Sequence, residues 1–72
     1  MTPTEFFEKG SVGTRISYGK GSGIRVHILY LSKVGEYAIG KHIGTGRRLH
    51  LLLHNGLLKS AHGCFGEVKL IE

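Results

Sequence analysis

Glycine interrupts this chain at short intervals. Twelve of the 72 residues are glycine, and they are spread along the chain without a Gly-X-Y period. Collagen-like and long helical structures do not fit this spacing. Short strands joined by tight turns fit it well, because glycine reaches the positive φ angles that such turns require. The spacing therefore predicts a mostly β protein whose chain reverses direction often.

The length and composition predict one small domain, residues 1–72, because single domains rarely fall below this size. Cys64 is the only cysteine, which excludes a disulfide framework and a Cys-rich zinc site. A lone thiol fits a reducing compartment, so we expect a cytoplasmic protein. No apolar run approaches the roughly 20 residues of a membrane helix. Met1–Phe7 lacks the basic start of a secretory signal, and we expect no membrane partner.

Residues 1–10 are predicted to form a short helix. Thr2 and Glu5 have the spacing of a capping box, in which each side chain binds the backbone N–H of the other residue. Gly10 suits the position just after a helix, where glycine commonly adopts a left-handed conformation. A helix this short is unstable alone, so Phe6 or Phe7 is expected to anchor it over an open end of a sheet.

Residues 13–72 show the alternation of short strands. The Asn55-Gly56 pair favours a two-residue hairpin turn that pairs His54 with Leu57, Leu53 with Leu58, Leu51 with Ser60 and Leu49 with His62. A rival interpretation makes 47–54 a short basic helix, since its leucines also fit helical spacing. We therefore predict an all-β (mostly) fold: a small SH3-like or OB-like barrel, or a curled antiparallel sheet of five to six short strands, with a short N-terminal helix. The expected strands are 14–18, 24–33, 37–43, 47–54, a strand starting at Leu57, and 67–71.

The segment 24–33 begins with one apolar and one polar face and ends apolar on both faces. Ile24, Val26, Ile28 and Tyr30 share one face of an unbroken strand, but Leu29 and Leu31 make its far half apolar on the other face too. Either that half is buried on both sides, or a bend moves it between layers. In an unbroken strand Tyr30 belongs to the core.

The charge is unbalanced. Ten Lys or Arg stand against five acidic residues, all Glu, for a net charge of +5. Such an excess favours anionic partners: nucleic acid, nucleotides or an acidic protein face. Plain solubility is the alternative explanation.

Two loops combine glycine with positive charge: 19–23 and 41–48. Glycine lets backbone N–H groups approach a phosphate, and Lys and Arg supply charge. Neither loop is a P-loop, because Gly-x-x-x-x-Gly-Lys-Ser/Thr is absent. The alternative is that the loops are ordinary turns with solvated charges. The candidate phosphate contacts are Arg15, Lys20, Ser22, Arg25, Lys41, Thr45, Arg47 and Arg48.

Two further features bear on this hypothesis. Arg15, Lys20, Arg25 and His27 are expected to form one basic strip. Tyr18, Tyr30 or Tyr37 would offer bases a stacking surface, unless all the tyrosines pack in the core with their hydroxyls at its rim.

Metal binding and catalysis are not expected. His50 and His54 lie about 13 Å apart on a strand, too far to share an ion. Cys64 follows His62 at strand spacing, but a lone Cys beside Phe65 is more often a small packed hydrophobe. We predict a protein that is not an enzyme and needs no cofactor or metal.

The function predicted from the sequence is a binding module for an anionic partner, chiefly nucleic acid. One alternative is a protein-binding adaptor or inhibitor, such as a phage-type effector. Another is a homo-oligomer that sequesters a nucleotide or other phosphorylated ligand. Homo-oligomerisation is expected in any case, because too many apolar side chains fall on outer faces: Leu29, Leu31, Leu52, Leu57 and Ile71.

Overall fold

The computed structural model describes residues 1–71, apart from the side chain of Ser22. The elements follow the chain in this order: α1 (Pro3–Lys9), β1 (Arg15–Tyr18), the 3-10 turn η1 (Lys20–Ser22), β2 (Ile24–Ser32), β3 (Tyr37–His42), β4 (Arg48–His54), β5 (Leu57–Ser60), β6 (Gly63–Phe65) and β7 (Val68–Ile71).

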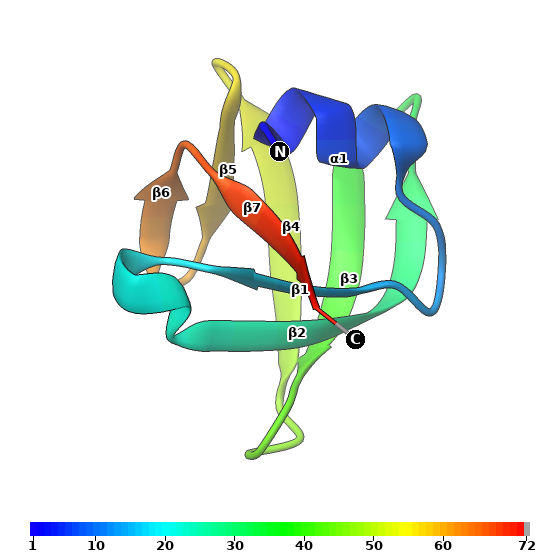
Figure 1. Cartoon of the computed structure of the whole chain (residues 1–72). Helices are drawn as coiled ribbons and strands as arrows, with labels where there is room; N and C mark the ends of the chain where they lie inside the picture. Colours follow the sequence, from blue (N-terminus) through cyan, green and yellow to red (C-terminus); the bar gives the residue numbers. More distant parts are fainter. Residues whose placement is uncertain (72) are drawn as a thin grey trace.

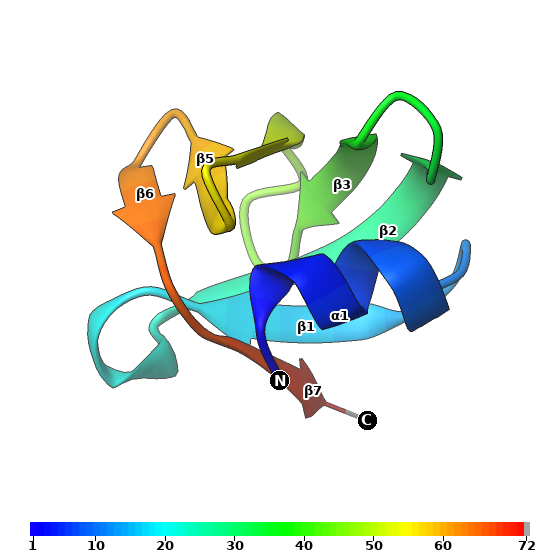
Figure 2. The same cartoon turned by 90° about the horizontal axis from the view of Figure 1, so that it is seen from above.

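The strands form a single antiparallel sheet that curls into a half-barrel (Figure 1). Its seven strands run in the order β6-β5-β4-β3-β2-β1-β7. The predicted small, barrel-like, mostly β class is confirmed. The additional strand is the three-residue β6, which the sequence did not indicate. Figure 2 shows α1 lying across the inside of the curl, where it covers the open end of the sheet.

The predicted capping box of α1 is present. The Glu5 N–H donates to the Thr2 hydroxyl at 3.2 Å, and the Thr2 N–H donates to the Glu5 carboxylate at 3.3 Å. The bonds from the Thr2 backbone and side chain lower the pKa of Glu5. The cap therefore stabilises the helix at neutral pH and loses this contribution as the pH falls through that lowered pKa.

Gly10 ends the helix for a different reason from the predicted one. Its φ of −70° is extended, not left-handed. A Cβ at this position would lie 2.5 Å from the Phe6 carbonyl oxygen and 3.0 Å from its ring. Glycine is required here because the chain leaves the helix close against Phe6. Both Phe6 and Phe7 are buried and anchor the helix.

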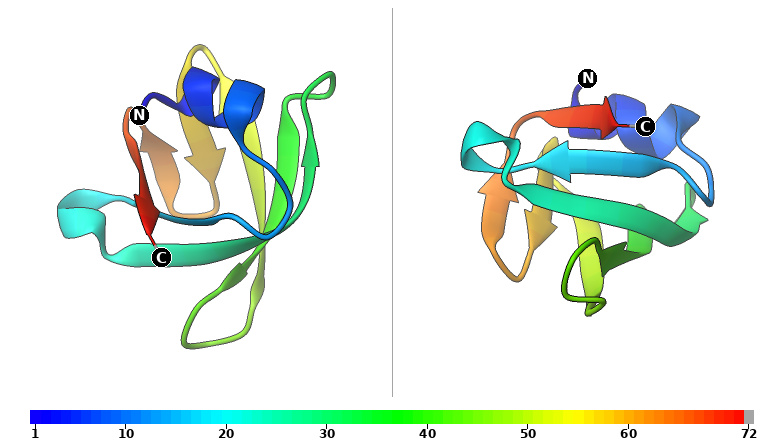
Figure 3. Two further views of the ribbon diagram at one scale, coloured as in Figure 1. Left: turned by 45° about the vertical axis from the view of Figure 1, so that its right-hand side comes forward. Right: turned by 60° about the horizontal axis from the view of Figure 1, so that its bottom comes forward.

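The core fills the inside of the curl, between the sheet and α1 (Figure 3). Each strand from β1 to β5, and β7 as well, contributes at least one fully buried side chain, and α1 adds its phenylalanines. The buried hydrophobic residues are Phe6, Phe7, Ile16, Tyr18, Val26, Ile28, Ala38, Leu51, Leu58 and Val68.

A bulge in β2 exchanges the faces of that strand. The pairing of β2 with β3 shifts register between Ile28 and Tyr30, leaving Leu29 as the extra residue. Beyond the bulge Leu31 packs against the core opposite Ala38, and Tyr30 is half-exposed. The bend foreseen for this strand is therefore present. The placements of Tyr30 in the core and of Leu31 on the outer face were wrong, since one inserted residue reverses the alternation.

Gly40 leaves room for a core side chain between β2 and β3. It is buried and pairs with Ile28 across the sheet. A Cβ built on Gly40 would lie 2.0 Å from Cγ1 of Val26, whose side chain is completely buried. A larger residue would therefore displace Val26 in the core.

The Asn55-Gly56 turn is the predicted hairpin. Asn55 and Gly56 have φ angles of 52° and 76°, as a turn with two left-handed residues requires. The predicted pairs of His54 with Leu57 and Leu53 with Leu58 are both present. The pairing of β4 with β5 ends at Leu52 with Lys59, so the predicted pairs of Leu51 with Ser60 and Leu49 with His62 were wrong; the chain turns at Ser60 into β6 instead. The segment Arg48–His54 is strand β4, so the helical interpretation was wrong.

We predict that Gly40→Ala destabilises the fold by about 1–3 kcal/mol, because the added methyl group overpacks against Val26. Urea unfolding measures this change. Gly23→Ala is the matched control, since Gly23 has a helical φ of −76° and its Cβ would meet nothing closer than 3.5 Å. Its effect should stay within about 0.5 kcal/mol. Equal effects of the two substitutions would refute the role of Gly40.

Tyr18→Phe is expected to leave the stability at pH 7 unchanged or raised by up to about 1 kcal/mol. The Tyr18 hydroxyl is buried and has no hydrogen-bond partner of acceptable geometry among the described residues. Burial raises the pKa of Tyr18 above its ordinary value of 10.0, and the Ser60 hydroxyl opposes only part of this shift. The wild type should therefore lose stability as the pH rises above about 10, and the variant less so. Urea unfolding at several pH values tests both effects; a loss above about 1 kcal/mol at pH 7 would show a hydrogen bond to the hydroxyl.

Candidate nucleic-acid interface

Four basic side chains form a row across the outer face of the sheet. The register pairs Arg15 with His27, His27 with Lys41, and Lys41 with Arg48. Directly paired residues point to the same side of a sheet. Neighbouring strands lie about 4.8 Å apart, so the row extends roughly 14 Å from β1 to β4. We call these four residues the basic row.

The positive charge of this face is not neutralised within the strands that carry it. The strands β1 to β4 contain no Asp or Glu. Arg25 and Lys69 lie beside the row, on either side of Ser17, which is 3% exposed. Glu67 lines a pocket together with Ser17 and Lys69, so the positive charge is offset on that side.

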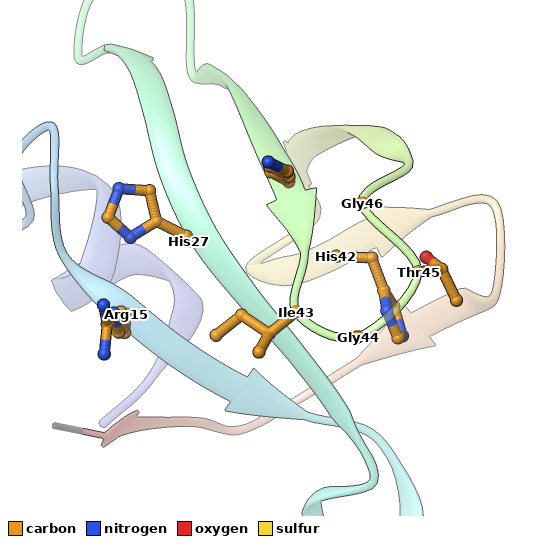
Figure 4. A pocket seen from close by; sticks show the side chains of 8 residues that line it. Arg15, His27, His42, Ile43, Gly44, Thr45 and Gly46 are labelled. Carbon is orange, nitrogen blue, oxygen red and sulfur yellow. The ribbon is translucent and has the colours of Figure 1, made fainter.

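An open pocket of about 520 Å³ lies beside the row, where the loop between β3 and β4 projects from the sheet. Figure 4 shows Arg15 and His27 on their neighbouring strands, with Ile43 and the loop Gly44–Gly46 across from them. Lys41 also lines the pocket. Among the described residues, the exposed N–H groups of Gly44 and Thr45 donate to no other group. These amides, with the surrounding cations, suit an anion such as phosphate.

An aromatic cluster occupies the same outer face next to the row. We define it as Tyr30, Tyr37 and His50, from β2, β3 and β4. The ring centroids of Tyr30 and Tyr37 are 6.3 Å apart, and those of Tyr37 and His50 are 5.8 Å apart. A hydrogen bond of 2.7 Å joins the Tyr37 hydroxyl to Nδ1 of His50. Ile39 lies between Tyr30 and His50 in the register.

The structure groups some of the predicted site residues and separates others. Arg15, Arg25, Lys41 and Arg48 share the outer face, and Thr45 lines the pocket beside them. Lys20 lies in η1, beyond the end of β1 remote from Arg15, so it does not join the strip predicted with Arg15 and Arg25. The side chain of Ser22 lies outside the described part of the structure.

Arg47 and Arg48 diverge although they are adjacent in the sequence. Arg48 pairs with Lys41 on the outer face. Arg47 precedes β4 and lines a separate pocket of about 280 Å³ with His42, Leu49 and His62. In that pocket Nδ1 of His42 is buried and has no hydrogen-bond partner among the described residues. Strand alternation separates consecutive residues in this way, so the two arginines predicted as phosphate contacts lie at different places on the surface.

The three tyrosines lie on different sides of the sheet, Tyr18 in the core and Tyr30 and Tyr37 on the outer face. Tyr18 is buried against Phe65, with ring centroids 5.2 Å apart, so it offers no stacking surface. Tyr30 is half-exposed and Tyr37 partly exposed on the outer face. His50 was missed as their partner, because its contact with Tyr37 depends on the pairing of β3 with β4. The alternation of 47–54 was the only signal that placed His50 on an outer face.

Three carboxylates lie at the opposite end of the molecule from the β3–β4 loop (Figure 1). Glu5 and Glu8 lie on α1, which also carries Lys9. Glu36 lies in the turn between β2 and β3, and it lines one pocket together with Glu8 and Lys33. Glu67 lies apart from them and lines a pocket with Ser17 and Lys69. The helix end therefore mixes acidic and basic side chains, whereas the strands β1 to β4 carry basic side chains and no carboxylate.

Cys64 was placed wrongly by the sequence analysis. It is a free, exposed cysteine on β6, paired with Lys59, and it does not pack in the core. Among the described residues, no group of three or more His, Cys, Asp or Glu side chains is arranged to hold a metal ion. Within the same residues, no helix has both the length and the hydrophobicity needed to cross a membrane.

Comparison with protein-family models, with curated proteins and with solved structures gives no match to this chain.

We expect Cys64 to react fully with a thiol reagent in the folded protein, because its side chain is exposed. Cys64→Ala should change the free energy of unfolding by no more than about 0.5 kcal/mol, since little packing is lost. Thiol titration with and without denaturant, together with urea unfolding, tests both points. A thiol that reacts only after unfolding would contradict this placement.

Proposed function

We propose that this protein is a non-enzymatic module that binds nucleic acid through the outer face of its sheet. The observation that supports this most is the basic row, Arg15, His27, Lys41 and Arg48, aligned in register on strands without a carboxylate. A regular line of basic side chains, three of them Arg or Lys, matches the repeating negative charge of a phosphate backbone.

The distribution of charge over the whole molecule favours the same partner. The carboxylates of α1 and of the β2–β3 turn stand beside Lys9 and Lys33, whereas the strands of the basic row carry no carboxylate, so a polyanion would be attracted most strongly to the row. Solubility alone requires no such separation, because scattered charges serve that purpose equally well.

The proposal assigns a binding role to each group in the site. Arg15 and Arg48 would bind phosphate oxygens through paired N–H groups, and Lys41 would act as a point charge between them. The pocket at the β3–β4 loop would receive one phosphate, held by the Gly44 and Thr45 amides as well as by side chains. The basic loop 41–48 is then part of the interface, whereas Lys20 and Arg47 are peripheral to it.

The test is a salt titration with labelled single-stranded and duplex oligonucleotides. The logarithm of the affinity should fall linearly with the logarithm of the salt concentration, because bound phosphates release counterions. The double variant Lys41→Ala/Arg48→Ala should bind more weakly and flatten the slope by about 1.4 for single strands or 1.8 for duplex.

The matched control is Lys9→Ala/Lys33→Ala, which removes the same charge from α1 and from the β2–β3 turn. It should leave the slope almost unchanged. Equal losses for both double variants would mean that net charge alone attracts the polymer. No measurable binding of any oligonucleotide by the wild type at low salt would exclude the proposed function.

A second candidate is capture of a small phosphorylated ligand, and the pocket of about 520 Å³ specifically favours it. Its cationic lining and free loop amides suit a mononucleotide as well as one phosphate of a polymer. Titration with mononucleotides separates the two candidates. Saturable binding at one site, with no gain in affinity for longer chains, would favour the small ligand.

Homo-oligomerisation and a protein partner remain predictions. Leu29, Leu52 and Leu57 are 38–40% exposed on the outer side of the chain. Burying them between two copies would add to a small core. Native mass spectrometry would report the number of subunits and any protein or nucleotide that stays bound.

A further inference from the structure

The aromatic cluster beside the basic row indicates which kind of nucleic acid the protein would bind. Resting on the proposed function, we infer that the ligand is a single strand whose bases stack on Tyr30, Tyr37 and His50 while its phosphates lie along the basic row.

The exposure of Tyr30 is the first argument. Unbroken alternation would turn this side chain into the core, and the bulge at Leu29 turns it outward instead. The ring is left 50% exposed in consequence. Leaving half of a large aromatic surface in water costs hydrophobic stabilisation that a core position would have gained. A stacked base would cover the ring and recover that stabilisation.

The cluster is held in place before any ligand arrives. The 2.7 Å hydrogen bond to Nδ1 of His50 fixes the Tyr37 ring, and Tyr30 lies against Tyr37 at a centroid distance of 6.3 Å. Ile39 and Leu52 provide apolar neighbours within the same rows of the sheet. A rigid aromatic surface loses little conformational entropy on binding, so stacking on it is more favourable.

The spacing between charge and rings suits a nucleotide. Ile39 and Tyr37 lie on the same face of β3 as Lys41, at about 7 and 13 Å from it along the strand. A chain with its phosphates on the basic row therefore brings its bases over Ile39 and the surrounding rings. No carboxylate interrupts this path on β1 to β4.

A duplex does not use this arrangement. Its base faces are covered by neighbouring base pairs, so only phosphates and base edges reach a protein. A duplex bound by the projecting β3–β4 loop would leave the aromatic cluster without contacts. Single strands expose base faces that stack on aromatic side chains whatever the sequence, which predicts weak sequence preference.

The experiment compares three probes of about 12 nucleotides: oligothymidylate, an abasic strand with the same phosphates, and a duplex. The chain has three tyrosines and no tryptophan, so quenching of tyrosine fluorescence reports stacking directly. Oligothymidylate should quench the emission and bind the wild type about tenfold or more tightly than the abasic strand does. Its affinity should also exceed that of the duplex.

Tyr30→Ala should lose about tenfold in affinity for oligothymidylate while the salt slope stays unchanged. Tyr30→Phe keeps the ring and serves as the matched control, with affinity close to that of the wild type. The abasic strand should bind all three proteins equally. Its comparison with oligothymidylate on the wild type tests stacking even if Tyr30→Ala fails to fold.

The outcomes distinguish the two levels of the proposal. Equal, salt-dependent binding of oligothymidylate and the abasic strand by the wild type would overturn base stacking and leave nucleic-acid binding intact. Tighter binding of the duplex, with no tyrosine quenching, would also overturn base stacking and leave nucleic-acid binding intact. It would indicate that the duplex binds at the β3–β4 loop. Failure of every probe to bind would remove the proposed function together with this inference.

Discussion

The packing of Val26 against Gly40 is the contact on which the core of the curled sheet depends. Because Gly40 has no side chain, the buried Val26 occupies the space where a Cβ would lie. The curl creates an inner surface small enough to be filled by a few strand residues and covered by one short helix (Figure 2). A flatter sheet of this length would leave much of that apolar surface in water, and a domain this small has little stability to lose.

The same curl produces the candidate binding surface. Side chains on the inside of the curl form the core, and those on the outside form the face that carries the basic row and the aromatic cluster. The bulge at Leu29 links the two sides, because it brings Leu31 into the core and turns Tyr30 out. The strand β2 therefore contributes to the stability of the fold through the core, and to the proposed function through the basic row and the aromatic cluster.

The charges act at longer range than these contacts. Carboxylates are confined to positions outside β1 to β4, and three of them lie on α1 or in the turn between β2 and β3. The outer face thus keeps its positive potential, which salt screens at distances beyond about 8–10 Å. The glycine-rich loop between β3 and β4 adds free backbone N–H groups at the edge of this field, where an anion would be drawn.

Local patterns in the sequence were enough to predict those elements that depend on a few neighbouring residues. The Thr2–Glu5 capping box and the Asn55-Gly56 turn with its two nearest pairs form through hydrogen bonds and steric contacts between residues close in the sequence. The basic character of the outer face followed from strand alternation at Arg15 and Arg25. These features are local, so the tertiary structure did not alter them.

Other features arise only when strands distant in the sequence are paired. Alternation with a period of two cannot indicate where a bulge inserts a residue, so Tyr30 and Leu31 were assigned to the wrong faces. The exposure of Cys64 depends on β6 lying at an edge of the sheet, where no further strand covers it. The alignment of Arg15, His27, Lys41 and Arg48, and the contact of Tyr37 with His50, require the registers of three strand pairs at once. Packing of the curled core sets those registers, and no segment of the chain carries that information alone.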